Sequence, residues 1–216
     1  MKTILFCLPG FLIGCCLFSC QKELSPNPQP GLLFDGTSLK GWEIPNFGPQ
    51  GPVWIENRAV HLGMGDGLTG ITWQGDFPRM NYRVTLDAMR EQGIDFFCGM
   101  TFPVDSSYCT WIVGGWGGMV VGFSNIDGEN ASENQTSRLM KFERNRWYHL
   151  ELVVQPDTIK AFIDGQAVIT IATKQHRFSM RSLMGLSTPF GLTSWQTTAA
   201  LKNIRVASLD TTLQNR

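Results

Sequence analysis

Apolar and polar residues alternate with a period of two along much of the chain from residue 53 to residue 207. Residues 81–89 and 147–154 show this alternation most clearly, and it is the pattern of strands that are buried on one face. Their expected core positions are Tyr82, Val84, Leu86 and Ala88 in the first segment and Tyr148, Leu150, Leu152 and Val154 in the second. Polar residues occupy the opposite faces, so each strand should cover one side of a core.

Turn residues divide the rest of this region into further short strands. Asn57-Arg58 and Asp164-Gly165 each lie between two strand-like segments, and Asp-Gly favours the type I′ turn of a hairpin. The further expected strands are residues 53–56, 59–62, 94–102, 108–113, 158–163, 167–171 and 200–207. The segments 94–102 and 108–113 are apolar on both faces, which is typical of central strands. A helical period is limited to a few residues near 132–140, so we predict an all-β sandwich or jelly roll of two antiparallel sheets.

The N-terminus has the pattern of a secretory signal. One lysine precedes an apolar run over residues 4–18, which is shorter than the roughly 20 residues that span a bilayer. Residues 17–20, Leu-Phe-Ser-Cys, match a lipobox, so we expect cleavage before Cys20 and a lipid on that cysteine. Residues 12–15 also fit the rule but leave a very short signal, and a signal without lipidation is the remaining alternative.

This interpretation divides the chain into four parts. They are a signal peptide at 1–19, a lipid-anchored Pro-rich linker at 20–31, one β domain at 32–210 and a C-terminal tail at 211–216. The linker composition is typical of a semi-extended tether. Because Gln21 rather than aspartate follows Cys20, we expect sorting to the outer membrane of the cell envelope, with the lipid as the contact to the membrane.

Composition narrows the class of partner. The formal net charge is zero, which gives no indication of a nucleic-acid partner. Seven tryptophans, 14 phenylalanines and 23 glycines accompany the strands, a combination that points to a saccharide ligand. The sequence leaves the oligomeric state open.

Two cysteines lie in the predicted domain, Cys98 and Cys109. An exported location permits a disulfide between them, and they would sit on neighbouring strands of a hairpin that turns near residues 104–106. A symmetric hairpin places them diagonally, so a bridge needs a favourable register or a bulge. A disulfide and two buried free thiols both remain open.

Residues 114–136 carry the densest candidate chemistry. Glycines around Trp116 permit positive φ and a close ligand approach, and an exposed indole there could stack on a sugar ring. Asn125, Asn130 and Asn134, with the carboxylates Asp127 and Glu133, supply donors and acceptors for hydroxyl groups. The alternative is a turn-rich loop whose Asx side chains satisfy its own backbone.

Three segments together resemble a known family. Residues 33–42 (LFDGTSLKGW), residues 146–152 with the turn 163–165, and residues 201–206 (LKNIRV) are similar to signatures of the bacterial 3-keto-disaccharide hydrolase family. The resemblance spans residues 31 to about 209 and implies a concanavalin A-like sandwich. Where typical members carry a strand with acidic residues, this chain has GGWGG at 114–118 and the loop to residue 136, so it resembles a divergent branch.

The family reaction implies a base beside a 3-keto sugar, because the ketone acidifies the neighbouring carbon–hydrogen bond and permits elimination. We expect Asp127 and Glu133 as base or acid and His149 as their partner, since His149 points away from the core side of its strand. A half-exposed structural histidine is the simpler alternative. Asp95, a carboxylate on an apolar stretch, is a further candidate for substrate binding or a structural group.

No zinc-like spacing occurs, and we expect no cofactor, although the oxygen-rich loop is also of the kind that binds a structural calcium ion. Three functions follow: a hydrolase acting on 3-keto sugars, a non-catalytic glycan-binding lipoprotein, and a structural envelope lipoprotein.

Overall fold

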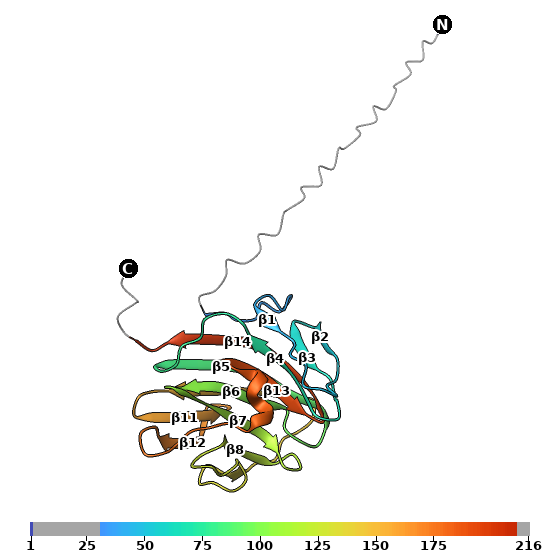
Figure 1. Ribbon diagram of the computed structural model, residues 1–216. Coiled ribbons are helices and arrows are strands. Elements are labelled where there is room, and N and C mark those ends of the chain that lie inside the picture. The colour runs from blue at the N-terminus through green and yellow to red at the C-terminus, as the bar shows by residue number, and fades with distance from the viewer. Residues whose placement is uncertain (2–30, 211–216) are drawn as a thin grey trace.

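Two antiparallel sheets of seven strands face each other in the computed structural model, which describes Met1 and residues 31–210 (Figure 1). The expected signal peptide, the lipid-bearing Cys20, the linker up to residue 30 and the tail 211–216 lie outside the described residues. In the described part of the chain, no helix has the length and apolar character needed to cross a membrane.

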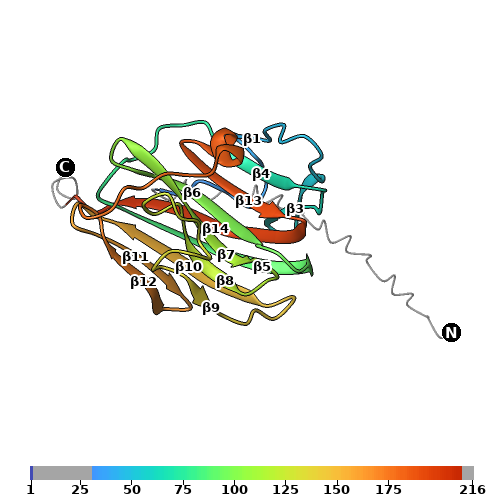
Figure 2. The same ribbon diagram turned by 60° about the horizontal axis from the view of Figure 1, so that its bottom comes forward.

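The first sheet, called here the pocket sheet, carries the candidate site. Its strands in spatial order are β1 (Trp42–Glu43), β4 (Leu68–Trp73), β13 (Phe190–Trp195), β6 (Cys98–Val104), β7 (Ser107–Gly115), β8 (Val120–Ser124) and β9 (Arg138–Leu139). The second, called the back sheet, has the order β12 (Gln166–Ala172), β11 (Thr158–Ile163), β10 (Trp147–Val154), β5 (Tyr82–Gly93), β14 (Thr197–Ser208), β3 (Ala59–Leu62) and β2 (Val53–Glu56). This arrangement confirms the predicted all-β sandwich of jelly-roll type (Figure 2).

The core lies between the sheets and uses the residues that the alternation selects. All eight predicted core positions of residues 81–89 and 147–154 are at most 2% exposed. The predicted strands 53–56, 59–62, 147–154 and 158–163 match β2, β3, β10 and β11. Asp164 and Gly165 have φ values of 50° and 76°, as the predicted type I′ turn requires.

The β6–β7 hairpin settles the state of the two cysteines. Cys98 lies opposite Val113, whereas Cys109 lies opposite Phe102, four positions further along β6. At about 3.4 Å per residue this offset places the two Cα atoms well beyond the roughly 7 Å limit for a disulfide. Both cysteines are buried free thiols, so the disulfide alternative is wrong and the free-thiol alternative holds.

Six elements of the pocket sheet region are absent from the sequence prediction. They are the strands β1, β4, β8, β9 and β13 and the short 3₁₀ helix η1 (Ser182–Ser187). Residues 132–140 form turns and the two-residue strand β9 rather than a helix. On its outer face the pocket sheet carries a second apolar cluster, which consists of Leu68, Phe96, Ile112, Val120, Ala131 and Met184. Loops and η1 therefore cover part of this face, and that is where the candidate site forms.

The start of the domain pairs with its last strand. The Val206 amide donates to the Gly31 carbonyl at 2.8 Å, and the Leu33 amide donates to the Ile204 carbonyl at 2.9 Å. Residues 31–33 therefore run beside β14, at the same end of the molecule (Figure 1).

Candidate functional site

The glycine-flanked Trp116 forms the tip of the turn between β7 and β8. Trp116 has a φ of 48°, and Gly114, Gly117 and Gly118 have φ values of 81°, 83° and 94°. This left-handed backbone is what the glycines permit, as the sequence predicted. The indole is 41% exposed and is therefore available to a ligand.

A buried arginine fixes this turn from inside the molecule. Arg90, at the end of β5, donates from Nη1 to the Gly118 carbonyl at 3.3 Å and from Nη2 to the Phe142 carbonyl at 2.6 Å. Burial, and then repulsion from Arg144, lower the pKa of the Arg90 guanidinium from its ordinary value. A side chain at Gly118 would meet Arg90 Nη1 at 2.5 Å, so this glycine is needed for the close contact. The Trp116 turn is consequently held in place.

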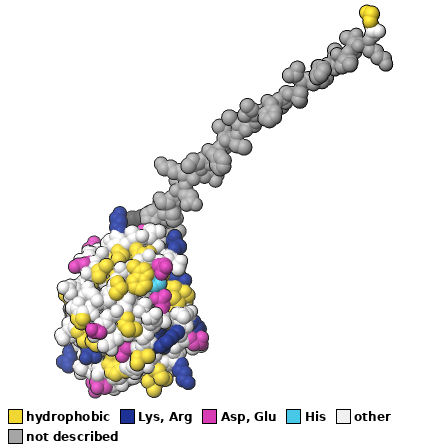
Figure 3. All heavy atoms as spheres, turned by 90° about the vertical axis from the view of Figure 1, so that its right-hand side faces the viewer, with side chains coloured by type: hydrophobic (Ala, Val, Ile, Leu, Met, Phe, Trp, Pro, Cys, Tyr) yellow, Lys and Arg dark blue, Asp and Glu magenta, His cyan; other side chains and the backbone are white. Residues whose placement is uncertain are grey.

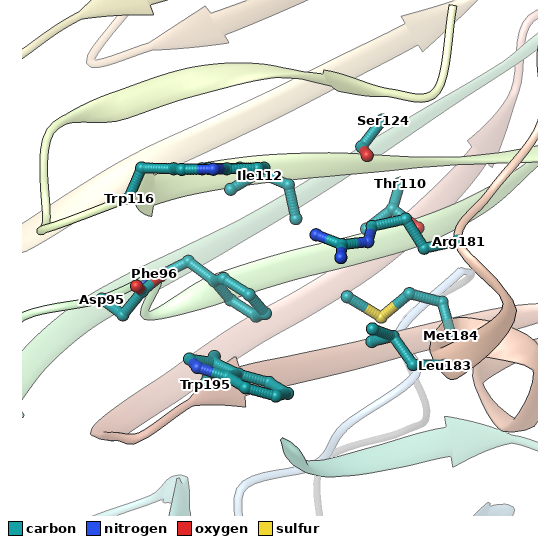
Figure 4. Close-up of a pocket in the computed structure, with 10 residues that line it drawn as sticks. All are labelled: Asp95, Phe96, Thr110, Ile112, Trp116, Ser124, Arg181, Leu183, Met184 and Trp195. Carbon is teal, nitrogen blue, oxygen red and sulfur yellow. The ribbon is translucent and has the colours of Figure 1, made fainter. Parts of the chain in front are cut away.

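A hollow of about 220 Å³ opens beside Trp116 on the outer face of the pocket sheet. Figure 4 shows Trp116 and Trp195 on opposite sides, with Phe96 between them and the Arg181 guanidinium pointing in from the far end. The complete lining is Asp95, Phe96, Thr110, Ile112, Trp116, Ser124, Arg181, Leu183, Met184 and Trp195. Its volume lies below the roughly 300–1,000 Å³ of sites for drug-sized ligands, so the hollow suits one small ring.

Close backbone packing builds the walls of this hollow. A Cβ at Gly191 in β13 would lie 2.6 Å from the Ser187 Cβ, so this glycine lets η1 rest on the sheet. A Cβ at Gly122 in β8 would lie 2.5 Å from the Ala131 carbonyl oxygen, so this glycine admits the β8–β9 loop. The Trp195 amide donates to the Phe96 carbonyl at 3.1 Å, which brings the end of β13 beside the Asp95-Phe96 segment.

Asp95 and Arg181 supply the charges of the hollow. Asp95 is half-buried, and its Oδ1 accepts a hydrogen bond from the Phe96 amide at 2.7 Å. The Asp95 backbone amide donates to Thr197 Oγ1 at 3.2 Å, so the backbone that carries the carboxylate is held in place. Within residues 31–210, Arg181 forms no ion pair, and its guanidinium is exposed to a ligand. One carboxylate and one guanidinium therefore face the same space.

Asp127 lies outside the hollow and makes local contacts. Its Oδ1 accepts from the Arg177 amide at 2.8 Å, and its Oδ2 lies 2.7 Å from His176 Nδ1. The backbone hydrogen bond from the Arg177 amide, followed by the side-chain hydrogen bond with His176, lowers the pKa of the Asp127 carboxyl below its ordinary value. Asp127 thus joins the β8–β9 loop to the segment that leads to Arg181.

Glu133 and Asn130 interact with each other. Glu133 Oε2 accepts from the Asn130 side-chain amide, and Asn130 Oδ1 accepts from the Ser132 amide at 2.9 Å and the Ser132 hydroxyl at 2.7 Å. This is an Asx turn closed by a carboxylate. Neither residue lines the hollow.

Asn134 and Asn125 also serve the loop backbone. Asn134 is 3% exposed, and its Nδ2 donates to the carbonyls of Phe123, Glu129 and Asn130 at 2.8, 3.1 and 2.8 Å. Its Oδ1 accepts from the Thr136 amide and hydroxyl. Asn125 accepts from the Ser124 hydroxyl at 2.7 Å and exchanges backbone hydrogen bonds with Ser179. These asparagines therefore fit the alternative interpretation of the sequence, in which the Asx side chains of the loop satisfy the loop's own backbone.

His149 lies on the other side of the molecule from the hollow. It faces outward from β10 in the back sheet, and its Nδ1 is 2.8 Å from Asp87 Oδ1. Asn203 donates to the other Asp87 oxygen at 2.6 Å. The structure therefore does not bring Asp127, Glu133 and His149 together around one cavity. Of the predicted site residues, Trp116 and Asp95 line the same hollow.

No group of three or more His, Cys, Asp or Glu side chains converges as metal ligands within the described part of the chain. The oxygens expected for calcium are engaged elsewhere, because both Asp127 oxygens and Asn134 Oδ1 accept hydrogen bonds from the protein. These three oxygens are therefore already engaged within the protein.

Sequence reasoning missed Trp195 and Arg181. Trp195 alternates with the core residues of β13, a signal that could have placed it on an outer face. Arg181 precedes η1 without a motif of its own, and only the fold brings it to the hollow.

The fold and the hollow define a class. They describe a lectin-type sandwich of two antiparallel sheets with a tryptophan-lined hollow on the outer face of one sheet. The model of the 3-keto-alpha-glucoside-1,2-lyase-like domain family matches residues 29–207, and the chain belongs to that family. The family resemblance seen in the sequence is thereby confirmed.

Solved structures with the same fold include carbohydrate-binding and enzymatic domains. The carbohydrate-binding module CBM66 from Bacillus subtilis has a TM-score of 0.51 and 18% identity, covering 78% of this chain and 96% of that chain. A candidate glycosyl hydrolase from Parabacteroides distasonis has a TM-score of 0.54 and 12% identity, covering 82% and 93%. A Bacillus subtilis protein of unknown function with a galectin-like fold has a TM-score of 0.56 and 10% identity, covering 78% and 90%. At these identities the likeness shows the fold alone. No curated protein matches the chain.

Proposed function

We propose that the domain binds a 3-keto sugar in the hollow between Trp116 and Trp195 and cleaves its glycosidic bond by elimination. The observation that carries this proposal is the composition of the hollow, which combines two indoles, one carboxylate and one guanidinium. Indole faces stack on the C–H faces of a pyranose, and the charged groups match the proton and the negative charge that move in the reaction.

In the proposed reaction Asp95 is the base. Its Oδ2 takes the proton from the carbon between the ketone and the anomeric carbon, and the electron pair forms an enolate. The negative charge that grows on the ketone oxygen is stabilised by the Arg181 guanidinium. The enolate then collapses, the bond from the anomeric carbon to the glycosidic oxygen breaks, and the leaving alcohol takes a proton from water. The hydroxide left from that water adds to the anomeric carbon of the resulting double bond, and Asp95 returns its proton to the neighbouring carbon, so the net reaction is hydrolysis and the base is regenerated.

The number of carboxylates favours elimination over ordinary glycoside hydrolysis. Retaining and inverting glycosidases use two carboxylates on either side of the scissile bond, about 5–10 Å apart. Asp95 is the one carboxylate that lines this hollow in the described part of the chain. Elimination beside a ketone needs a single base, so it fits this lining better.

A non-catalytic glycan-binding domain is the second candidate function. It is favoured by the two indoles, because aromatic walls bind sugars without any chemistry. In that case Asp95 and Arg181 hydrogen-bond to hydroxyl groups and leave the sugar unchanged. The same experiment separates the two functions.

The test incubates the full-length protein with 3-keto-trehalose, and with trehalose as a control, and follows monosaccharide release. We expect release from the keto sugar alone. Asp95→Asn should lower kcat about 100-fold or more, because it removes the base and keeps the shape. Arg181→Met should lower kcat as well, whereas Trp116→Ala should mainly raise KM.

Asp127→Asn is the matched control, since it neutralises a carboxylate outside the hollow. Full activity in Asp95→Asn together with loss in Asp127→Asn or Glu133→Gln would overturn the assignment of the base and favour the loop residues. Absence of release, with tryptophan fluorescence still shifting on added 3-keto-trehalose, would leave the glycan-binding function in its place.

We also propose that the protein is a lipoprotein of the cell envelope, anchored through Cys20 and sorted to the outer membrane. The lipobox at residues 17–20, followed by Gln21, supports this proposal. In a Gram-negative host, Cys20→Ser should move the protein out of the membrane fraction, whereas Cys15→Ser should not. The reverse result would assign the anchor to Cys15. If both variants stay in the membrane fraction, neither cysteine is the lipid anchor.

A further inference from the structure

A second exposed tryptophan lies on the back sheet. Trp54 in β2 is 38% exposed, and its indole is stacked on His61 of β3 with ring centroids 4.9 Å apart and an interplanar angle of 13°. One face of the indole is thus covered and the other is open. On the side of the domain that carries β2 and β3, Figure 3 shows hydrophobic side chains gathered beside a histidine and acidic side chains.

His61 holds this indole in a fixed position. His61 is 6% exposed, its Nδ1 lies 3.1 Å from Glu91 Oε2, and its Nε2 lies 3.3 Å from the Glu56 carbonyl oxygen. Both ring nitrogens are therefore engaged, and the imidazole cannot turn freely. An aromatic surface that is already ordered binds a ligand at a lower entropic cost than a mobile one.

Polar side chains share a hollow with the Trp54 indole. Its lining includes Met64, Glu91, Gln92 and Asn145. The side-chain amides of Gln92 and Asn145 take part in no hydrogen bond with residues 31–210, so they can serve hydroxyl groups. A flat indole with amides and a carboxylate at its edge is the chemistry that recognises a pyranose with equatorial hydroxyls.

A third hollow lies between the Trp54 hollow and the Trp116–Trp195 hollow and shares one lining residue with each. This middle hollow is lined by Met64, Asp66, Asp95, Gly117 and Gln196, among others. It shares Asp95 with the first hollow and Met64 with the Trp54 hollow. The three hollows therefore adjoin in series around the rim of the sandwich.

The rim between the hollows is tied to Gln196 and to the first residues of β14. The Met64 amide donates to Thr198 Oγ1 at 3.2 Å, and Gln196 Nε2 donates to the Asp66 carbonyl at 3.4 Å. The loop around residue 65 is thus fastened to the same strand end that carries Thr197, the acceptor for the Asp95 amide. The path from Asp95 to Trp54 is built on one fixed segment.

We propose that the ligand is an oligosaccharide that extends from the Trp116–Trp195 hollow past Asp95 to Trp54, where a further sugar ring stacks on the indole. The inference rests on the proposed function of the first hollow as a sugar site. It changes the substrate class from a disaccharide to a longer chain, whose end unit lies at Asp95 and whose remaining units follow the rim.

The test measures binding of unoxidised glucose oligomers to the full-length protein by calorimetry. The probes are maltose and cellobiose against maltohexaose and cellohexaose. We expect at least one hexasaccharide to bind about tenfold more tightly than its disaccharide. Trp54→Ala should remove this gain and leave disaccharide binding unchanged, whereas Trp54→Phe, which keeps an aromatic face, should retain most of it.

Gln92→Ala provides a second variant that leaves the stacked pair intact, and it should weaken hexasaccharide binding by a smaller factor. Equal binding of hexasaccharide and disaccharide, no binding of either hexasaccharide, or full hexasaccharide binding in Trp54→Ala would overturn the inference. Trp116→Ala distinguishes this failure from that of the proposed function: it should weaken both chain lengths, and if it weakens neither, the first hollow is not the sugar site.

Discussion

Asn134 illustrates how a polar loop residue can have the composition of a binding site and the role of a structural one. Its amide is buried and satisfies three carbonyls and the Thr136 amide and hydroxyl. The sequence shows the amide, but it does not show that the loop folds over it. A residue with both ends of its amide engaged has no donor left for a ligand.

The contacts of Asn134 predict a large stability effect. Asn134→Ala should lower the free energy of unfolding by about 2–3 kcal/mol, because buried carbonyls lose their donor. Urea unfolding followed by tryptophan fluorescence measures the change, with the exposed Gln135→Ala as the control. A stable variant that has lost sugar binding would instead assign Asn134 to the ligand.

The contacts of the single residue Asp127 predict that the stability of the fold depends on pH. The pKa of its carboxyl lies below the ordinary 3.8, so the ionised form is favoured in the folded state. Its contribution to stability is fully present above the ordinary pKa and is lost as the pH falls through the lowered value. Wild type and Asp127→Asn should therefore differ in urea midpoint at pH 6 and converge in stronger acid. A difference that persists or grows in acid would contradict this assignment.

At the scale of elements, period-two alternation was sufficient to predict a strand wherever one face of that strand meets solvent. The strands β2, β10 and β11 were predicted with their bounds for this reason. The outer faces of β8 and β13 are covered instead by loops and η1, so nearly every residue of both strands is buried and the period-two pattern is weak. The cover depends on contacts between distant segments, which a local pattern does not contain.

The packing of η1 on β13 predicts a second effect. Gly191→Ala would place a methyl group 2.6 Å from Ser187 and push η1 off the sheet. We expect a loss of about 1–3 kcal/mol in unfolding free energy and weaker binding in the Trp116–Trp195 hollow. Gly185→Ala in the same helix is the matched control, because nothing lies within 4 Å of its Cβ position, and it should stay within about 0.5 kcal/mol of wild type. Equal behaviour of the two variants would show that η1 is not a wall of the site.

At the scale of the whole molecule, the site is assembled from segments that are far apart in the sequence. Asp95 and Trp116 were expected, since each stands out against its own neighbours. Trp195 comes from β13 and Arg181 from the segment before η1, and the fold brings both to the hollow that Asp95 lines. The predicted partner His149 belongs to the other sheet, which alternation alone could not decide because both sheets have outward faces.

Alkylation of the two buried cysteines reports how often the two sheets of the sandwich separate. Burial raises the pKa of the Cys98 thiol to about 12 and raises that of Cys109 as well, so neither forms a reactive thiolate at neutral pH. Iodoacetamide should leave both unmodified in the native protein and modify both in guanidinium, as peptide mass spectrometry can show. Rapid modification under native conditions would mean that the two sheets separate frequently.

The central position of β14 has a consequence for biosynthesis. This strand is the last of the domain to be made, yet it lies between β5 and β3 and also receives residues 31–33 at the start of the domain. Until residue 208 has left the ribosome, the back sheet exists as two unjoined halves. Folding of the domain therefore waits for β14 to be synthesised, and a chain that emerges vectorially stays open to proteases and to export machinery until this strand closes the sheet.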